Sequence, residues 1–290
     1  MFTATLIAAT LSDGDISDAR DRLAAAGSMP GDWAWIDEGV AADIAFADAP
    51  DAARAALGDL VSTDVVVQPN VGRRKKLLIA DMDSTMITVE CIDELADYAG
   101  IKDQVSAVTE AAMRGELDFE GALDARVALL AGLSEDVIEQ CLAERVTIMP
   151  GAKALVRTMR AQGATAILVS GGFTRFAEPV AREIGFDRAV ANRLLIDNGL
   201  LTGKVARPIV GADAKLANLN AAIDALGIES FATLAVGDGA NDLKMIEAAG
   251  LGVAYHAKPI VAAAAGARID HGDLTTLLYA QGYCRAAWAL

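Results

Sequence analysis

The sequence predicts an α/β protein with a doubly wound parallel sheet, a small helical insertion and a separate N-terminal unit. Three observations support this fold class. From residue 77 onward, short apolar runs alternate with helical segments, which is typical of a parallel sheet buried on both faces. Residues 90–148 break this alternation and have helical patterning almost throughout. Residues 1–72 have a βαββαβ order of their own.

The composition limits the class of protein. The chain has 290 residues, 53% of them hydrophobic, and a formal net charge of −15. This length indicates about two domains, and the negative charge argues against a nucleic-acid partner. Three cysteines without disulfide or metal spacing fit a reducing compartment. We find no signal peptide and no apolar run of membrane-spanning length, so we expect a cytoplasmic protein without a membrane partner.

The N-terminal unit is expected at residues 1–72. Its predicted strands are 3–9, 33–37, 42–47 and 64–68, and its predicted helices are 16–26 and 51–57. This order matches a ferredoxin-like fold, which is common in small ligand-sensing modules but does not by itself identify a function. Residues 69–72 then read as a linker, and we interpret the basic run at 73–76 as a solvated join.

The second domain is expected at residues 73–290. Its predicted strands are 77–80, 164–169, 233–236 and 252–255, and its predicted helices are 152–161, 174–184, 213–226, 241–249 and 261–265. Asp197, Asn198 and Gly199 lie between apolar runs and predict a hairpin at 194–204.

The insertion at 90–148 follows the first strand of this sheet. Its predicted helices are 90–99, 102–113, 118–130 and 134–143, and Ser134 is expected to cap the last of them. An insertion at the carboxyl end of a strand lies over the crevice where such sheets bind ligands. We therefore interpret it as a lid.

Carboxylates follow two of the predicted strands. Asp81 and Asp83 come directly after strand 77–80, and Asp238 and Asp242 follow strand 233–236. Because parallel strands end at one edge of the sheet, we expect Asp81, Asp83 and Asp238 to converge on a hard divalent ion such as Mg²⁺. Without a cation or hydrogen bonds, ionised carboxylates at buried strand ends would be costly. The alternative for the first pair is a simple acidic turn.

Two further segments are suited to an anion. Strand 164–169 continues into Ser170, Gly171 and Gly172 before a helix, where a hydroxyl and backbone N–H groups can cradle a phosphate. A plain strand-to-helix turn explains this segment equally well. Lys215, early in helix 213–226, is the candidate cation for a phosphoryl group among carboxylates, although alone it reads as a surface lysine.

In chain order, these segments resemble the haloacid dehalogenase (HAD) superfamily. They are residues 81–85 (DMDST), 170–172 (SGG), Lys215 and 237–242 (GDGAND). Residues 77–290 are similar in particular to the phosphoserine phosphatases of that superfamily, including the size and position of the helical insertion. The resemblance implies an HAD-like catalytic domain with a helical cap. Some relatives carry amino-acid-binding modules N-terminal to it, so residues 1–72 are expected to be ACT-like.

The resemblance also implies an activity and catalytic roles. The expected enzyme uses Mg²⁺ to convert O-phospho-L-serine into L-serine and phosphate, the last step of L-serine synthesis. Asp81 is expected to form an aspartyl-phosphate, and Asp83 is expected to act as general acid and then general base. The metal is expected to be held by the side chains of Asp81 and Asp238 and the backbone carbonyl of Asp83, with Asp242 behind them.

The same resemblance implies substrate-binding residues. Those expected to bind or orient the phosphoryl oxygens are Ser170, Gly171, Lys215 and Asn241. In the insertion, Glu90 matches the family position that binds the amino group. Arg126 matches the carboxylate binder, for which a guanidinium fork is well suited. Met113 and Phe119 match apolar residues that close over the substrate.

Two alternatives remain open at this stage. A phosphotransferase or phosphatase acting on another small phosphomonoester would share the core residues. A regulatory protein that senses an amino acid is the other, and the intact pair of Asp81 and Asp83 argues against it. Residues 1–72 hold three basic and twelve acidic residues and account for most of the net charge. Amino-acid sensing, a structural role and a homodimer contact are the alternatives for this unit.

Overall fold

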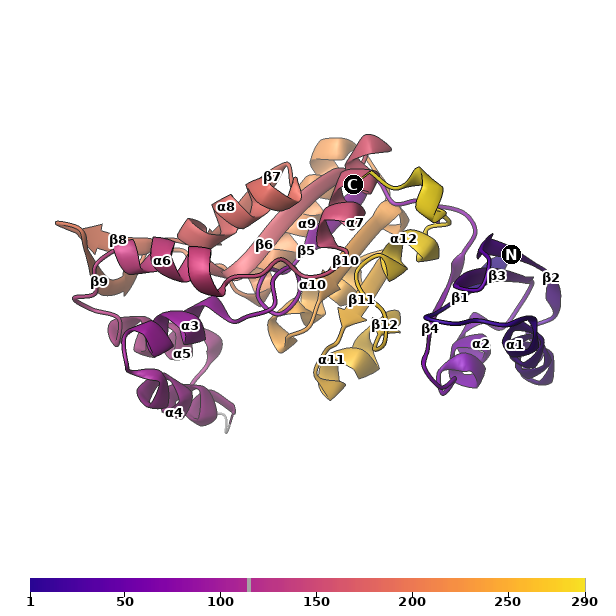
Figure 1. The fold of residues 1–290 in the computed structure, drawn as a ribbon, viewed down its shortest axis with the longest axis horizontal. Coiled ribbons are helices and arrows are strands. Elements are labelled where there is room, and N and C mark those ends of the chain that lie inside the picture. The colour runs from indigo at the N-terminus through magenta and orange to yellow at the C-terminus, as the bar shows by residue number, and fades with distance from the viewer. Residues whose placement is uncertain (114–115, 290) are drawn as a thin grey trace.

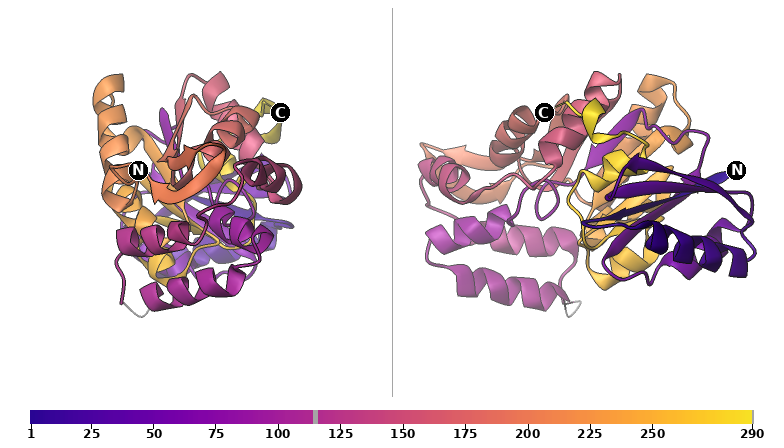
Figure 2. Two further views of the ribbon diagram at one scale, coloured as in Figure 1. Left: turned by 90° about the vertical axis from the view of Figure 1, so that its left-hand side faces the viewer. Right: turned by 45° about the vertical axis from the view of Figure 1, so that its right-hand side comes forward.

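The structure is a computed structural model that describes residues 1–113 and 116–289 (Figure 1). A small antiparallel sheet forms one end of the molecule, a larger parallel sheet the middle and the helical insertion the other end (Figures 1 and 2). Among the helices of the described residues, none has both the length and the apolar content to cross a bilayer.

The N-terminal unit has the predicted βαββαβ order. Its elements are β1 (Phe2–Ala8), α1 (Asp13–Ala25), β2 (Pro30–Asp37), β3 (Ala41–Phe46), α2 (Pro50–Leu57) and β4 (Thr63–Pro69). The strands pair antiparallel in the order β2-β3-β1-β4. Ser12 begins α1 with a capping box, because its hydroxyl accepts from the Asp15 N–H and the Asp15 carboxylate accepts from the Ser12 N–H.

The central sheet has six parallel strands in the order β12-β11-β10-β5-β6-β7. They are β5 (Leu77–Ala80), β6 (Thr165–Phe173), β7 (Arg188–Asn192), β10 (Thr233–Gly237), β11 (Leu251–Tyr255) and β12 (Ala267–Ile269). The four strands predicted from apolar runs are confirmed. Strands β7 and β12 were not predicted, because they lie at the two edges and contain arginine instead of a continuous apolar run.

Helices cover both faces of this sheet. One layer contains α7 (Ala152–Ala161), α8 (Thr174–Ile184) and α12 (Thr276–Ala280), and the other contains α9 (Ala212–Leu226), α10 (Leu243–Ala248) and α11 (Pro259–Ala264). Leu78 and Ala80 of β5 pack into the first layer, whereas Leu77 and Ile79 pack into the second. Burial on both faces explains why the strand is apolar without alternation. The prediction missed α12 and placed the start of α10 two residues too early.

The insertion consists of the four expected helices. They are α3 (Cys91–Tyr98), α4 (Lys102–Met113), α5 (Phe119–Ala128) and α6 (Asp136–Arg145). The predicted hairpin forms as β8 (Leu194–Asp197) and β9 (Leu200–Val205), but it pairs outside the central sheet and lies against the insertion. The Gly132 N–H donates to the Leu201 carbonyl (2.8 Å) and the Glu135 N–H to the Gly199 carbonyl (2.9 Å).

The cap predicted for the last helix of the insertion needs a correction. Glu135, not Ser134, is the N-cap residue of α6. The Ser134 hydroxyl still accepts a hydrogen bond from the Asp136 N–H (3.3 Å). The helix therefore begins one residue later than the capping pattern predicts.

The prediction of a solvated join at residues 73–76 is wrong for Arg73 and Lys75, whereas Arg74 and Lys76 are exposed. The Arg73 guanidinium is largely buried and donates to both carboxylate oxygens of Asp43 (2.6 and 2.7 Å) and to the Ala280 carbonyl (2.8 Å). Lys75 is buried, donates to the Phe231 carbonyl and has its pKa lowered to about 8 by burial. The basic run is thus part of the contact between the N-terminal unit and the rest of the chain.

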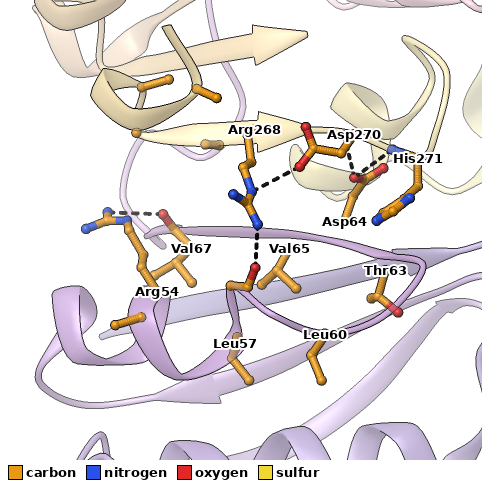
Figure 3. Close-up of a pocket in the computed structure, with 16 residues that line it drawn as sticks. Arg54, Leu57, Leu60, Thr63, Asp64, Val65, Val67, Arg268, Asp270 and His271 are labelled. Atoms are coloured by element: carbon orange, nitrogen blue, oxygen red, sulfur yellow. Dashed lines mark hydrogen bonds and ion pairs between the residues drawn. The ribbon is translucent and has the colours of Figure 1, made fainter. Parts of the chain in front are cut away.

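A pocket of about 320 Å³ lies at this contact (Figure 3). Asp64 of β4 accepts hydrogen bonds from the backbone N–H groups of residues 270–272. Arg268 of β12 donates to the Gly58 carbonyl (2.5 Å) and forms an ion pair with Asp270 (3.0 Å). These polar groups therefore tie the two units together.

Candidate active site

A cleft of about 460 Å³ lies between the insertion and the carboxyl ends of the central strands. Eight of the residues predicted from the sequence line it: Asp81, Asp83, Glu90, Phe119, Arg126, Gly171, Asp238 and Asn241. The site also includes two strand-end residues that the sequence analysis did not single out, Thr85 and Lys258.

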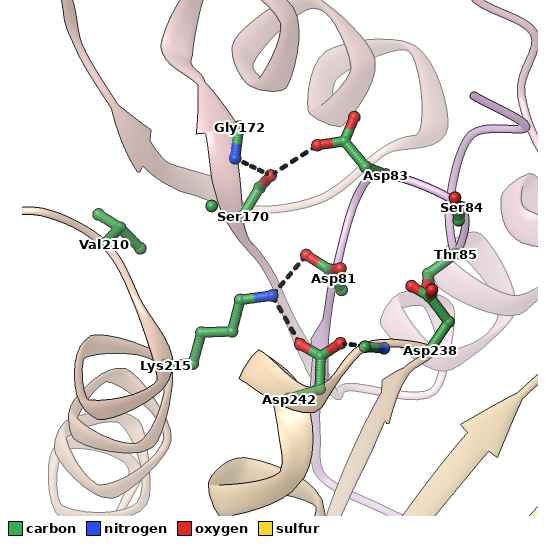
Figure 4. A network of polar contacts seen from close by, with 12 residues as sticks. Asp81, Asp83, Ser84, Thr85, Ser170, Gly172, Val210, Lys215, Asp238 and Asp242 are labelled. Carbon is green, nitrogen blue, oxygen red and sulfur yellow. Dashed lines mark hydrogen bonds and ion pairs between the residues drawn. The ribbon is translucent and has the colours of Figure 1, made fainter. Parts of the chain in front are cut away.

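Asp81 and Lys215 form the buried centre of the site (Figure 4). Lys215 Nζ donates to Asp81 Oδ1 (2.5 Å) and to Asp242 Oδ1 (2.6 Å), and the Lys215 side chain is fully buried. The alternative interpretation of Lys215 as an ordinary surface lysine is therefore wrong. The Asp242 carboxylate also accepts from the Gly239 N–H (3.0 Å), which fixes the loop after β10.

Three carboxylates form a group that fits a metal ion. One oxygen each of Asp81, Asp238 and Asp242 lies within 4.8 Å of the other two. Three carboxylates around the single ammonium of Lys215 leave two negative charges in excess when all are ionised. Burial, followed by the nearby Asp242, raises the pKa of Asp81 well above its ordinary value and that of Asp238 to about 6. A hard divalent cation with oxygen ligands would neutralise this excess.

Asp242, which is expected behind the metal ligands, has one carboxylate oxygen within this group. Its two oxygens accept hydrogen bonds from Lys215 and from the Gly239 N–H. The Asp83 side chain points toward Ser170 and away from this group (Figure 4). Thr85, which lies two residues further on, donates from Oγ1 to Asp238 Oδ1 (3.2 Å) and orients that carboxylate.

Asp83 has the environment of an acid–base group. Its Oδ1 accepts from the Cys91 N–H at the start of α3 (3.1 Å), and its Oδ2 lies 3.5 Å from Ser170 Oγ. Burial and the nearby Glu90 carboxylate raise the pKa of Asp83 to about 7. A carboxyl group with this pKa can both give and take a proton near neutral pH.

The segment after the regular part of β6 is shaped by Ser170. This side chain is fully buried, and its hydroxyl accepts from the Gly172 N–H (2.8 Å), curling the chain around it. A β-carbon on Gly172 would lie 2.7 Å from Asp83 Oδ2, so glycine is needed for the close approach of this loop to Asp83. The loop therefore presents its backbone beside the aspartate pair, as expected for an anion cradle.

Glu90 and Arg126 lie in the cleft on the insertion side. Glu90 is the N-cap residue of α3, and its Oε1 accepts from the Ser84 hydroxyl (2.7 Å). Ser84 has a positive φ of 55°, which turns the chain sharply after Asp83. Arg126 of α5 donates from Nε to the Ala122 carbonyl one turn earlier (3.3 Å), while the side chain lines the cleft.

Of Phe119 and Met113, the two apolar residues predicted to close the site, only Phe119 has its side chain among the described residues. Phe119 begins α5 and lines the cleft, and its ring lies against the backbone of Gly171 and Gly211. The Met113 side chain lies outside the described residues. Asn241 and Lys258 complete the cleft on the opposite side.

Lys258 could have been found by the rule that identified the aspartates. It follows β11 by three residues and therefore lies at the same edge of the sheet as Asp238. Its N–H donates to the Asp238 carbonyl (3.2 Å).

Comparison with known proteins gives consistent results for the catalytic part. A family model for haloacid dehalogenase-like hydrolases matches residues 78–247. The chain is 47% identical over 213 residues to the phosphoserine phosphatase SerB2 of Mycobacterium tuberculosis, covering 73% of this chain and 52% of that protein. The chain thus spans about half the length of that relative and of a phosphoserine phosphatase from Streptomyces coelicolor.

Solved structures extend the similarity to the whole chain. A probable phosphoserine phosphatase from Vibrio cholerae aligns with a TM-score of 0.79 and 33% identity, covering 98% of this chain and 88% of that one. A structure described as a phospho-aspartyl intermediate analogue of phosphoserine phosphatase aligns with a TM-score of 0.66 and 38% identity, covering 71% and 98%. On the extent of the family match and of the identity, the chain belongs to the haloacid dehalogenase-like hydrolase family.

Proposed function

We propose that this protein is a Mg²⁺-dependent phosphatase that releases L-serine and phosphate from O-phospho-L-serine in the last step of L-serine synthesis. The observation that carries the proposal is one cleft that combines Asp81 and Asp83 with a fixed negative group, Glu90, and a fixed positive group, Arg126. The substrate has matching parts, namely a phosphate, an ammonium and a carboxylate. The similarity to phosphoserine phosphatases supports the same substrate.

The metal would be held by the carboxylates of Asp81 and Asp238 together with the Asp83 backbone carbonyl, with Asp242 behind them. The excess negative charge of this group and its oxygen-only ligands support Mg²⁺. When bound, the ion supplies charge neutralisation to the phosphoryl oxygens.

Asp81 is proposed as the nucleophile. Its carboxylate oxygen would attack phosphorus and form an aspartyl-phosphate while the bond from phosphorus to the serine oxygen breaks. Asp83 would give its proton to that serine oxygen and then take a proton from the water that cleaves the aspartyl-phosphate. A pKa of about 7 for Asp83 supports both half-reactions.

The phosphoryl group would be bound by residues from three segments of the chain. Ser170 and the Gly171 backbone would donate to its oxygens from β6, and Lys215 would face it from α9. Asn241 would orient it from the loop after β10. These groups come from separate strands or helices whose ends meet at one edge of the sheet, which supports catalysis by positioning and charge neutralisation.

The insertion would select phosphoserine. Glu90 would pair with the ammonium group and the Arg126 fork with the carboxylate. Phe119 would cover the substrate and exclude water. The exposed position of Glu90 at the mouth of the cleft supports a role in the first contact with the substrate.

We assign residues 1–72 to a ferredoxin-like, ACT-like domain and residues 73–290 to the catalytic domain with its cap at 90–148. The strand order β2-β3-β1-β4 supports the first assignment. One face of this sheet packs against Tyr279 and Trp288, which favours a structural role over a homodimer contact through that face. The free cysteines Cys91, Cys141 and Cys284 support a place in the reducing cytoplasm.

Phosphate release from a panel of phosphomonoesters, with and without Mg²⁺, tests the proposal. Phosphoserine is expected to be the preferred substrate, and a chelator is expected to abolish turnover. If phosphothreonine or sugar phosphates are hydrolysed equally well, the enzyme is instead a phosphatase of another small phosphomonoester. If no ester is hydrolysed but an amino acid binds, the protein is a sensor.

A further inference from the structure

Strand β6 leaves its regular pairing with β7 at the anion cradle. Between the pairs Val169–Val190 and Phe173–Asn192, three residues of β6 stand against one residue of β7. Such a bulge removes backbone groups from the ladder, and each buried group then needs another partner. The Gly171 carbonyl finds one in Asn192, whose side-chain Nδ2 donates to it (2.8 Å). Asn192 itself is only 2% exposed.

The Asn192 side chain also forms hydrogen bonds to a second segment, which leads into α9. Asn192 Oδ1 accepts from the Val210 N–H (2.8 Å), and Nδ2 approaches the Val210 carbonyl (3.4 Å). A primary amide offers two N–H donors and one carbonyl acceptor. The backbone groups around Asn192 match this set, because two carbonyls face its nitrogen and one N–H faces its oxygen.

The position of this second segment determines the position of α9 and therefore of Lys215. Val210 precedes Gly211, the N-cap residue of α9, and the Lys215 N–H donates to the Gly211 carbonyl (3.0 Å). The Lys215 ammonium then contacts Asp81. One buried amide therefore links the cradle at Gly171 to the start of the helix that carries the buried cation.

The ring of Phe119, in the insertion, packs against both of the segments that Asn192 joins. A β-carbon placed on Gly171 would lie 3.2 Å from the ring atom Cζ, and one placed on Gly211 would lie 3.1 Å from Cδ1. The ring thus packs directly on the backbone of two glycines. The spacing of these glycines is set by the bonds that Asn192 makes to Gly171 and Val210.

We propose that Asn192 is a positioning residue for the reaction. Asn192 fixes the distance between the Ser170–Gly171 cradle and the start of α9. This distance determines how the two segments bind the phosphoryl group and which surface the Phe119 ring packs against. Asn192 acts through these groups and does not line the cleft. The identity of the substrate in this inference rests on the proposed function, whereas the link between the two segments does not.

The substitution Asn192→Asp tests the inference in the full chain with Mg²⁺. An ionised carboxylate would place an acceptor against the Gly171 carbonyl, whereas a protonated carboxyl would restore one donor. We expect kcat/KM for phosphoserine to fall about 10- to 100-fold near pH 8, as for a misplaced catalytic geometry. The ratio of variant to wild-type kcat/KM is expected to recover as the pH is lowered, because burial favours the protonated carboxyl.

Asn198→Asp is the matched control, because it makes the same change in the exposed turn between β8 and β9. It is expected to keep wild-type kcat/KM at every pH. Circular dichroism and thermal melting establish that each variant is folded. A folded Asn192→Asp variant with wild-type kcat/KM near pH 8, or with a loss that does not change with pH, would overturn the inference.

Gly211→Ala provides a second test if Asn192→Asp does not fold. The added methyl group would press on the Phe119 ring while all bonds of Asn192 remain, and Gly211 has an extended backbone that alanine adopts. We expect a severalfold rise in KM with little change in kcat, relieved by adding Phe119→Leu. An unchanged KM would show that the packing of Phe119 on Gly211 does not control cap closure and would refute that part of the inference.

Failure of the proposed function gives a different result from failure of this inference. If the wild-type enzyme does not turn over phosphoserine, the proposed substrate is wrong. The Asn192→Asp comparison is then made with p-nitrophenyl phosphate, which has neither an amino nor a carboxyl group. The same pH-dependent loss with this ester supports the role of Asn192, and its absence refutes it.

Discussion

The ammonium nitrogen of Lys215 lies 2.5 Å from a carboxylate oxygen of Asp81, and no part of the Lys215 side chain is exposed. Burial alone would lower the pKa of this lysine, but the carboxylates of Asp242 and Asp81 outweigh burial and raise it. Lys215 therefore stays charged throughout the pH range of a folded protein. The proposed nucleophile faces a permanent positive charge.

Lys215→Met is expected to destabilise the metal-free protein. Removing one partner of a buried ion pair leaves uncompensated carboxylates and costs about 3–5 kcal/mol of unfolding free energy near pH 8. At lower pH the cost is smaller, because Asp81, whose pKa is already raised, takes up a proton. Urea unfolding at both pH values measures this. The control Lys244→Met removes an exposed ion pair with Asp213 and is expected to cost less than about 1 kcal/mol.

Asp81→Asn is expected to abolish turnover. An amide cannot form the acyl phosphate, and loss of a nucleophile costs more than about 10³-fold in kcat. Single-turnover phosphate release measures the residual rate, and Asp224→Asn, an exposed residue of α9, is the control. Activity retained within tenfold would reassign the nucleophile.

Arg126→Ala is expected to discriminate between substrates. Loss of the guanidinium should reduce kcat/KM for phosphoserine by about 10- to 100-fold, the value of a charge-assisted hydrogen-bonded pair. Phosphoethanolamine, which lacks the carboxylate, should be affected much less. Arg182→Ala on the exposed side of α8 should affect neither. Equal losses for the two esters would show that Arg126 does not bind the carboxylate.

Mg²⁺ is expected to stabilise the protein more at pH 8 than at pH 6. In the folded, metal-free protein the pKa of Asp238 is raised to about 6 and that of Asp81 is raised well above its ordinary value. A raised pKa means that the folded state holds more protons than the unfolded state, so stability falls as pH rises from about 4 through these values. Metal binding needs ionised ligands and releases those protons. Thermal melting with Mg²⁺ or EDTA at both pH values measures the difference, and an equal gain in Tm would contradict the assignment.

Arg73→Met is expected to weaken the contact between the two units. It removes hydrogen bonds from a largely buried guanidinium to Asp43 and Ala280 and should cost about 2–3 kcal/mol. Urea unfolding measures the loss. Arg74→Met, which changes the adjacent exposed arginine, should cost less than half as much. Equal costs for the two variants would show that the bonds of Arg73 do not hold the units together.

Local patterns predicted the strands that are buried on both faces and the residues at their ends. Leu77–Ala80 and residues 234–236 are apolar throughout because both faces are covered, and their parallel pairing explains why Asp81 and Asp238 meet. Edge strands such as β7 and β12 carry no such signal, because burial on one side allows arginine.

The contacts that the sequence did not reveal are those between distant segments. Lys215 is an ordinary residue in its helix, and only folding places it between Asp81 and Asp242. Asn192 has no motif around it, because its partners at Gly171 and Val210 are 21 and 18 residues away. The polar role of the run at 73–76 likewise depends on Asp43 and on carbonyls more than 200 residues later.

The position of β4 beside β12 has a consequence for association between molecules. Each is the last strand of its own sheet, and an edge strand offers unpaired backbone groups to any other chain. Here Asp64, at the start of β4, binds the backbone that follows β12, and Arg268 on β12 binds the Gly58 carbonyl. The two open edges therefore face each other, and the N-terminal unit restricts the access of other chains to the β12 edge of the central sheet.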